Sequence, residues 1–145
     1  MKISLGADHA GFQLKEEIKA HLLESGYEVI DEGAYDESRC DYPDFARKAA
    51  NDVIEGKSSF GILCCGTGEG ISIAANKING IRCGIGYNEE VSRLTRQHND
   101  ANMIAFGARF MKKEDVLKSV DAFLLTPFEG GRHIERVEKI HELEK

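Results

Sequence analysis

The sequence predicts a single Rossmann-like three-layer α/β/α domain, built on a five-stranded parallel sheet with an extra C-terminal helix. The length suits one domain of residues 1–145, and no stretch in the middle resembles a linker. Short apolar runs alternate with segments of helical periodicity along the chain. The strands are too apolar for either face of the sheet to be exposed to water, which favours a parallel sheet covered by helices on both sides.

Strand and helix patterns follow one another in a regular order. Apolar residues recur at helical spacing from Leu14 up to a stop at Gly26. After a polar connection at 32–42, Pro43 opens the second helix and Gly56 ends it. The predicted strands are 2–6, 27–31, 60–65, 81–86 and 103–107, and the later helices are 71–77, 89–98 and 113–125.

A further segment follows the last strand-helix unit. Residues 126–131 are typical of a turn, and a helix is expected at 132–145. Its apolar side contains Ile134, Val137 and Ile140. A helix appended to a finished domain often docks on a neighbour, so we expect this one to pack on a partner subunit.

The composition excludes several classes of partner. The 19 basic and 25 acidic residues give a net charge of −6, which argues against a nucleic-acid or acidic membrane surface. No apolar run approaches the ~20 residues that span a bilayer, and the first residues lead into a strand instead of a secretory signal. We therefore expect a cytoplasmic protein whose partner is a small molecule or a protein.

The four cysteines, at positions 40, 64, 65 and 83, form no C-x-x-C pair. Adjacent Cys64 and Cys65 would project to opposite faces of a strand, so neither a zinc site nor a disulfide framework is expected. Cys64 and Cys83 lie in apolar strand-like runs, where a buried, unreactive thiol is the simplest interpretation. The sequence thus predicts no metal site.

The stretch 60–76 passes from an apolar run through Cys65 to a glycine-rich segment and then to helix formers. This order is typical of a strand, an anion-binding loop and a helix. Glycines leave backbone N–H groups free to converge on a negative atom, and the helix start adds partial positive charge. These surroundings favour thiolate over thiol, so Cys65 is a candidate base or nucleophile. The alternative is a glycine turn with only a packing role.

The same loop departs from the known nucleotide-binding and phosphatase motifs. Gly66-Thr67-Gly68 begins like a dinucleotide fingerprint, but Ile71 occupies the place of the third glycine. No G-K-[ST] follows, as a P-loop requires, and residues 66–75 contain no arginine for a cysteine-phosphatase loop. Nucleotide binding and phosphatase chemistry are therefore disfavoured.

The loops after the strands should share one edge of the sheet, where ligands of such domains bind. Asp8 and His9 follow the first strand and offer a carboxylate and an imidazole for proton transfer or hydroxyl binding, although Asp8 could instead be a helix N-cap. His98 ends a helix, whose dipole favours an acid role, although a histidine there needs no function. The loops expected at this edge start at Asp8, Gly66, Tyr87 and Ala108.

Three arginines, Arg109, Arg132 and Arg136, are candidate anion-binding residues. Arg132 and Arg136 are four residues apart, so they project from one face of the last helix and could hold a phosphate near its amino end. Charged helix faces are usually only solvated, but the Gly130-Gly131 turn before Arg132 favours a functional role.

Six motifs stand in order along the chain and cover nearly all of it. They are Asp8-His9-Ala10-Gly11, Asp41-Tyr42-Pro43, Cys65-Gly66-Thr67-Gly68, Ser72-Ile73-Ala74-Ala75-Asn76, Arg96-Gln97-His98-Asn99 and Gly130-Gly131-Arg132-His133. Together they resemble the motifs of the type B ribose-5-phosphate isomerases. The wider family also includes galactose-6-phosphate isomerase subunits and allose-6-phosphate isomerases.

The resemblance implies interconversion of ribose 5-phosphate and ribulose 5-phosphate in the pentose phosphate pathway, without metal or organic cofactor. The reaction needs a base between C2 and C1, donors for the enediolate oxygen, a ring-opening group and a phosphate anchor. By resemblance, Cys65 is the base. The backbone N–H groups implied to hold the developing oxyanion belong to Gly66, Thr67, Gly68, Glu69 and Gly70.

The resemblance also assigns the remaining site residues. Thr67, close to the base, is implied to relay the hydroxyl proton, and His98 to open the sugar ring. Asp8 and His9 are implied to contact the open sugar. The other implied substrate contacts, with the arginines chiefly at the phosphate, are Asn99, Arg109, Arg132 and Arg136.

The resemblance further implies a homodimer, or a tetramer of such dimers, whose active site is shared between subunits. Two other functions stay open at this point. One is an allose-6-phosphate or galactose-6-phosphate isomerase, which relative kcat/KM on five- and six-carbon sugars would distinguish. The other is a non-catalytic phosphate- or nucleotide-binding module, which would bind without turnover.

Overall fold

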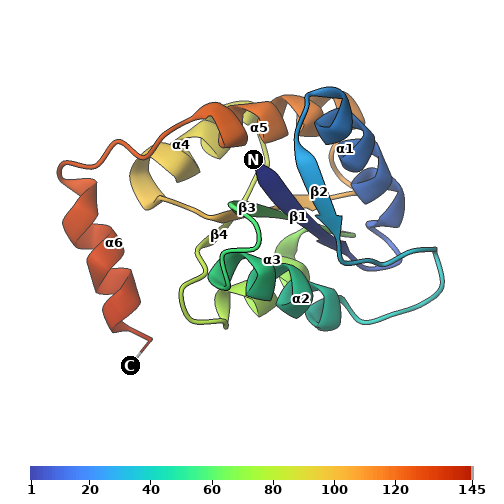
Figure 1. The fold of residues 1–145 in the computed structure, drawn as a ribbon, viewed down its shortest axis with the longest axis horizontal. Coiled ribbons are helices and arrows are strands. Elements are labelled where there is room, and N and C mark those ends of the chain that lie inside the picture. Colours follow the sequence, from blue (N-terminus) through green and yellow to red (C-terminus); the bar gives the residue numbers. More distant parts are fainter. Residues whose placement is uncertain (145) are drawn as a thin grey trace.

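A central parallel sheet organises the molecule (Figure 1). The structure, a computed structural model, describes residues 1–144. The strand order is β2-β1-β3-β5-β4, and every neighbouring pair is parallel. The strands are β1 (Lys2–Ala7), β2 (Glu28–Asp31), β3 (Phe60–Cys65), β4 (Cys83–Ile85) and β5 (Met103–Gly107).

Helices cover both faces of the sheet, which confirms the predicted three-layer α/β/α class. In Figure 1, α1, α4 and α5 lie above the sheet, and α2 and α3 lie below it. The helices are α1 (Phe12–Glu24), α2 (Tyr42–Ile54), α3 (Glu69–Asn76), α4 (Glu89–Asn99), α5 (Lys113–Leu125) and α6 (His133–Glu142). None of the helices within residues 1–144 is long and apolar enough to cross a membrane.

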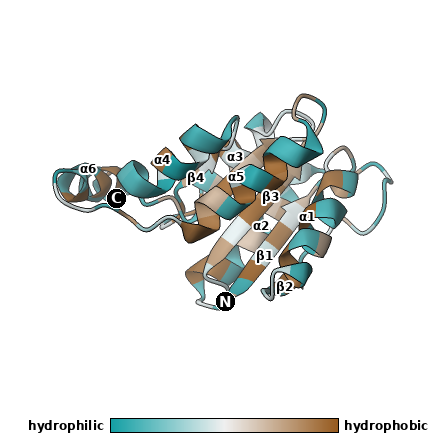
Figure 2. Ribbon diagram, turned by 90° about the horizontal axis from the view of Figure 1, so that it is seen from above, coloured by the Kyte–Doolittle hydropathy of each residue, from teal (hydrophilic) through white to brown (hydrophobic). Residues whose placement is uncertain are grey.

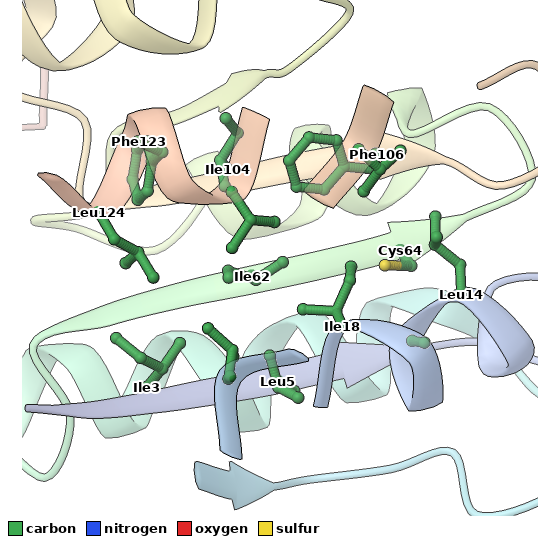
Figure 3. Packing of buried hydrophobic residues seen from close by; sticks show 14 of the residues in the cluster. Ile3, Leu5, Leu14, Ile18, Ile62, Cys64, Ile104, Phe106, Phe123 and Leu124 are labelled. Carbon is green, nitrogen blue, oxygen red and sulfur yellow. The ribbon is translucent and has the colours of Figure 1, made fainter. Parts of the chain in front are cut away.

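The central strand β3 contributes side chains to two separate apolar clusters. Ile62 and Cys64 pack with α1 and α5 on one face (Figure 3), whereas Leu63 and Cys65 pack with α2 and α3 on the other. The alternation follows from the two-residue period of a strand. The prediction that the adjacent cysteines point to opposite faces is therefore confirmed.

The thiols outside the glycine loop are only partly as predicted. Cys64 is 1% exposed, as expected, but Cys83 is half-buried because β4 is an edge strand. Burial raises the pKa of both thiols, which keeps them protonated and unreactive.

The predicted boundaries that differ from the structure by two residues or more belong to three elements. The fourth strand is three residues long instead of spanning 81–86, because it pairs with β5 alone at the sheet edge. Helix α3 begins at Glu69, two residues early, after Gly68 with φ of 83°. The last helix ends at Glu142, with Leu143 as its C-cap, and residue 145 lies outside the described residues.

Helix α6 belongs to neither helical layer and lies at the side of the domain next to α4, at the end of an extended segment (Figures 1 and 2). Its end is attached to the domain by Arg82 Nη1, 2.8 Å from His141 Nε2, and by Glu144, which accepts the N–H of Gly80 at 2.8 Å. An open groove of about 580 Å³ lies between this helix and the α3–β4 side of the domain.

Candidate active site

The loops that follow β1, β3 and β5 meet at the carboxyl edge of the sheet. The N–H of Asp8 donates to Cys64 O at 3.3 Å, and the N–H of Ala108 donates to Cys65 O at 2.9 Å. These bonds join the three loops because β3 lies between β1 and β5. The predicted gathering of loops at one edge is therefore confirmed by the fold.

The Cys65 thiol lies at the amino end of α3 and is 4% exposed. The N–H of Gly68 points at Sγ, 3.2 Å away. Gly68 reaches this geometry with a positive φ of 83°, which glycine adopts without strain. An N–H donor and a helix amino end both face the sulfur, which places this thiol to remove a proton.

The loop is packed tightly against the end of β5. A side chain on Gly107 would place its Cβ 2.4 Å from Thr67 O, so only glycine fits there. The Thr67 hydroxyl accepts the N–H of Glu69 at 3.1 Å, while its side chain faces solvent. Its own O–H is thus available to donate.

Arg109 and Tyr42 border the same loop. The N–H of Arg109 donates to Gly66 O at 3.0 Å, and its guanidinium lies against Gly66, since a Cβ there would be 3.1 Å from Nη1. Tyr42 opens α2 and lies against Gly70, where a Cβ would be 2.6 Å from the phenol ring. Tyr42 belongs to one of the motifs that carry the resemblance, but no local pattern predicted that it would border this loop.

Asp8 closes the turn that leads from β1 into α1. Its Oδ1 accepts the N–H of Gly11 at 3.0 Å, and its side chain is 7% exposed. The N-cap of α1 is Gly11, so the alternative of Asp8 as the helix N-cap is wrong. The N–H of Cys40 lies 3.3 Å from His9 Nδ1, which makes Nδ1 the acceptor and leaves the proton on Nε2.

His98 lies at the opposite edge of the sheet from Cys65. Helix α4 starts at the carboxyl edge after β4 and runs back to the amino edge, where β5 begins, and His98 is in its last turn. The His98 ring stacks on that of His133, with centroids 4.4 Å apart and planes at 15°. A single chain therefore does not bring His98 and Cys65 together.

His133 is a site residue that sequence reasoning left unassigned. It is 3% exposed, and Nε2 has no hydrogen-bond partner among residues 1–144. Burial, with the nearby His98 and Arg132, lowers the pKa of His133 and favours its neutral form. The sequence signal for a role of His133 was its position next to Arg132 in the Gly-Gly-Arg-His motif.

The remaining predicted residues surround this histidine pair. Asn99 ends α4 and is exposed, and its carbonyl accepts Arg82 Nε at 3.2 Å. Arg132 is the N-cap residue of α6, and Arg136 follows one turn later on an exposed face. The structure thus divides the predicted site into a cysteine edge and a histidine edge, defined as the surroundings of Cys65 and of His98.

The histidine edge also contains a possible ligand set for a metal. His98, Glu129 and His133 each offer one atom within 4.8 Å of the other two, among the residues that the structure describes. The two rings stack instead of pointing at a common centre, and Arg132 and Arg136 lie nearby. This arrangement suits an anion better than a cation.

Comparison with known proteins gives one consistent family. The ribose/galactose isomerase family model matches residues 3–140. The chain is 51% identical to the Escherichia coli ribose-5-phosphate isomerase B over 144 residues, covering 99% of this chain and 97% of that protein.

Solved structures agree with the sequence matches. The ribose 5-phosphate isomerase of Thermotoga maritima has a TM-score of 0.96 and 47% identity, with 97% of each chain covered. The Mycoplasma genitalium ribose-5-phosphate isomerase B, solved with bound ribulose-5-phosphate, has a TM-score of 0.94 and 40% identity, covering 99% of this chain and 95% of that one.

Proposed function

The chain belongs to the ribose/galactose isomerase family, and from its site we propose that it interconverts ribose 5-phosphate and ribulose 5-phosphate. The observation that carries the proposal is the Cys65 thiol, 4% exposed, with the N–H of Gly68 aimed at its sulfur. A place in the pentose phosphate pathway and a cytoplasmic location belong to the same proposal, since pentose phosphates are made and consumed there.

In this mechanism Cys65 moves one proton between two carbons. The thiolate takes the proton from C2 of the open aldose, which leaves an enediolate, and then returns it to C1. The Thr67 hydroxyl carries the other proton from O2 to O1, a role supported by the availability of its O–H. No redox partner is required, because the oxidation of C2 is balanced by the reduction of C1.

Backbone donors in the loop stabilise the enediolate oxygen. Two of the five N–H groups implied by the resemblance already have partners, since Gly68 N bonds Cys65 Sγ and Glu69 N bonds Thr67 Oγ1. The remaining N–H groups, those of Gly66, Thr67 and Gly70, therefore donate to the enediolate oxygen.

The active site is completed by a second copy of the chain. This part of the proposal is supported by the separation of the cysteine and histidine edges within one chain, and by the position of α6 at the side of the domain with part of its apolar surface exposed. Ile134 and Ile140 are 48% and 40% exposed on α6, whereas Val137 is buried. The C-terminal helix of the single domain would pack these side chains on its partner in a homodimer.

Each edge then has its own task. Asp8 and His9 contact the open sugar at the cysteine edge, where Arg109 also contacts the substrate. His98 of the other copy opens the ring. The residues of that copy proposed to bind substrate, with the arginines at the phosphate, are Asn99, Arg132 and Arg136.

A matched pair of cysteine variants tests this function. Conversion of ribose 5-phosphate is measured for the purified chain, Cys65→Ala and Cys64→Ala, with folding checked by circular dichroism. We expect Cys65→Ala to lower kcat by about 10³-fold, whereas Cys64→Ala, on the other face of β3, keeps most of the activity. A folded Cys65→Ala protein with more than a tenth of normal kcat would contradict the assignment of the base.

The same assay decides the sugar and the reaction class. Ribose 5-phosphate, allose 6-phosphate and galactose 6-phosphate are compared side by side by kcat/KM. We expect the five-carbon sugar to have the highest value. Binding of all three without turnover would instead favour a phosphate-binding module.

A further inference from the structure

Lys15 is a buried charge with no part in the proposed chemistry. Its side chain is 1% exposed, on the face of α1 that packs against the sheet. Lysine is almost never fully buried unless it is paired. The role of Lys15 therefore depends on the groups that its ammonium contacts.

The Lys15 ammonium is held mainly by Asp31, the last residue of β2. Nζ donates to Oδ1 at 2.7 Å and to Oδ2 at 2.8 Å, and also to Glu16 at 2.9 Å. Burial by itself would raise the pKa of Asp31, but hydrogen bonds from Lys15, Gly33 and Lys19 lower it overall. The Asp31 side chain, 12% exposed, is therefore held as a carboxylate beside the buried Lys15.

Asp31 in turn fixes the segment that follows it, the 31–35 turn. Its Oδ1 accepts the N–H of Gly33 at 3.0 Å, and its backbone oxygen accepts the Tyr35 hydroxyl at 2.8 Å. The 31–35 turn also forms hydrogen bonds with both backbone groups of Ala7, the last residue of β1. The N–H of Ala7 donates to Gly33 O at 2.7 Å, and the N–H of Ala34 donates to Ala7 O at 2.7 Å.

Ala7 is directly followed by Asp8 and His9, the proposed sugar contacts. On the opposite side the 8–11 turn lies against β3, because the N–H of Asp8 donates to Cys64 O at 3.3 Å and a Cβ on Gly11 would lie 2.2 Å from the same oxygen. The position of Asp8 and His9 is thus set between strand β3 and the 31–35 turn.

We propose that Lys15 is a positioning residue, which acts through Asp31 and the 31–35 turn to set where Asp8 and His9 meet the sugar. The inference rests on the proposed isomerase function. Buried ion pairs rarely stabilise more than apolar side chains of the same volume, whereas they do fix one geometry. Since the proposed phosphate contacts Arg132 and Arg136 lie on α6, we expect a larger effect on kcat than on KM.

A charge-deleting variant and a matched control test the inference. Lys15→Met keeps the length of the side chain but removes the charge, and Lys19→Met removes a 36% exposed partner of the same Asp31 carboxylate. With ribose 5-phosphate at 20 °C, we expect Lys15→Met to lower kcat about tenfold with KM changed less than about threefold. Lys19→Met should stay within about twofold of the wild type in both constants.

A double variant separates positioning from stability. Lys15→Met/Asp31→Leu replaces the ion pair by apolar side chains, so its Tm should recover towards that of the wild type. Its kcat should stay low, because no carboxylate then holds the N–H of Gly33. Recovery of kcat together with Tm, or a folded Lys15→Met protein with kcat within twofold of the wild type, would overturn the inference.

A surface variant covers the case in which Lys15→Met does not fold. Tyr35→Phe removes one hydroxyl from a 69% exposed side chain and loosens the same turn. We expect kcat to fall about threefold at unchanged Tm, and an unchanged kcat would count against the role of Lys15. An inactive wild-type chain would overturn the proposed function itself, whereas an active wild type with insensitive variants overturns only the positioning role.

Discussion

The cysteine edge and the histidine edge are built in different ways. At the cysteine edge, backbone groups and glycine contacts fix Cys65 and Asp8, which are 4% and 7% exposed. At the histidine edge, exposed side chains of α4 and α6 surround the stacked pair of His98 and His133. The first edge is fixed by contacts within one chain, whereas the second combines the buried His133 with exposed side chains of Asn99, Arg132 and Arg136, a surface that we propose a partner subunit covers.

The largest expected effect comes from separating the two edges on different chains. Cys65→Ala and His98→Ala should each lower kcat by at least about 10²-fold alone. In a shared-site dimer, refolding them together places one intact cysteine edge and one intact histidine edge at one site of each heterodimer. About a quarter of wild-type activity should then return, since half of the dimers have one of two sites intact.

Variants mixed without unfolding are the control, because subunits that do not exchange should stay inactive. No recovery after refolding, with heterodimers demonstrated by mass spectrometry, would place the complete site in one chain. That result would remove the proposed distinction between the two edges.

A methyl group at the end of β5 should disturb the cysteine edge alone. Gly107→Ala introduces a Cβ that would lie 2.4 Å from Thr67 O, so the loop must shift. We expect kcat to fall by about 10²-fold. Steady-state kinetics report on the cysteine edge, and the affinity for inorganic phosphate reports on the histidine edge. An unchanged kcat would show that the loop tolerates the displacement. Gly26→Ala, which adds a methyl group in open space at the turn after α1, is a control for the loss of a glycine outside the site.

Removal of a cation at the histidine edge should change mainly KM, whereas the Gly107→Ala variant changes mainly kcat. Arg132→Ala is expected to raise KM for ribose 5-phosphate about 30-fold with a smaller change in kcat, since a charge-assisted hydrogen bond contributes about 2 kcal/mol. Lys139→Ala, an exposed charge further along α6, is the matched control. Equal effects of the two variants would mean that only the net charge of the helix matters.

The smallest effect is a pH dependence of stability that arises from Glu32, which follows β2 and lies beside Asp52 of α2. A hydrogen bond to Asp52, together with burial, raises the pKa of Glu32 from 4.5 to about 7. Asp52 Oδ2 is buried and has no hydrogen-bond partner among the described residues, so a protonated Glu32 carboxyl is available to donate to Asp52. The folded chain keeps a proton that the unfolded chain releases, and stability therefore falls as pH rises from about 4.5 to 7.

Thermal unfolding measures this dependence directly. Glu32→Gln keeps a donor towards Asp52 without a titrating proton, so its Tm should vary less between pH 5 and pH 8, by about 3 °C, than that of the wild type. Glu24→Gln, at an exposed position of α1, should follow the wild type. A parallel pH profile for Glu32→Gln would assign the dependence to another group.

The fold was largely predictable because its signals are local. The strands at Phe60–Cys65 and Met103–Gly107 and the helix at Lys113–Leu125 have the predicted limits, since apolar runs and helical periodicity arise from neighbours in sequence. The predicted fourth strand was too long because its length depends on β5, its sole partner in the sheet. The buried Lys15 lay at helical spacing from Ile18 and Leu22, but nothing local identified Asp31 as its partner.

The sequence by itself determined the alternation of strands and helices, and with it a parallel sheet whose loops gather beside Cys65. It also supplied the motifs that indicate the family. The tertiary structure decided the strand order and the wide separation of His98 from Cys65. It also decided the path from Lys15 to Asp8. These features depend on contacts between residues far apart in the chain. The local sequence pattern does not determine such contacts, because it is compatible with several crossover arrangements of the same elements.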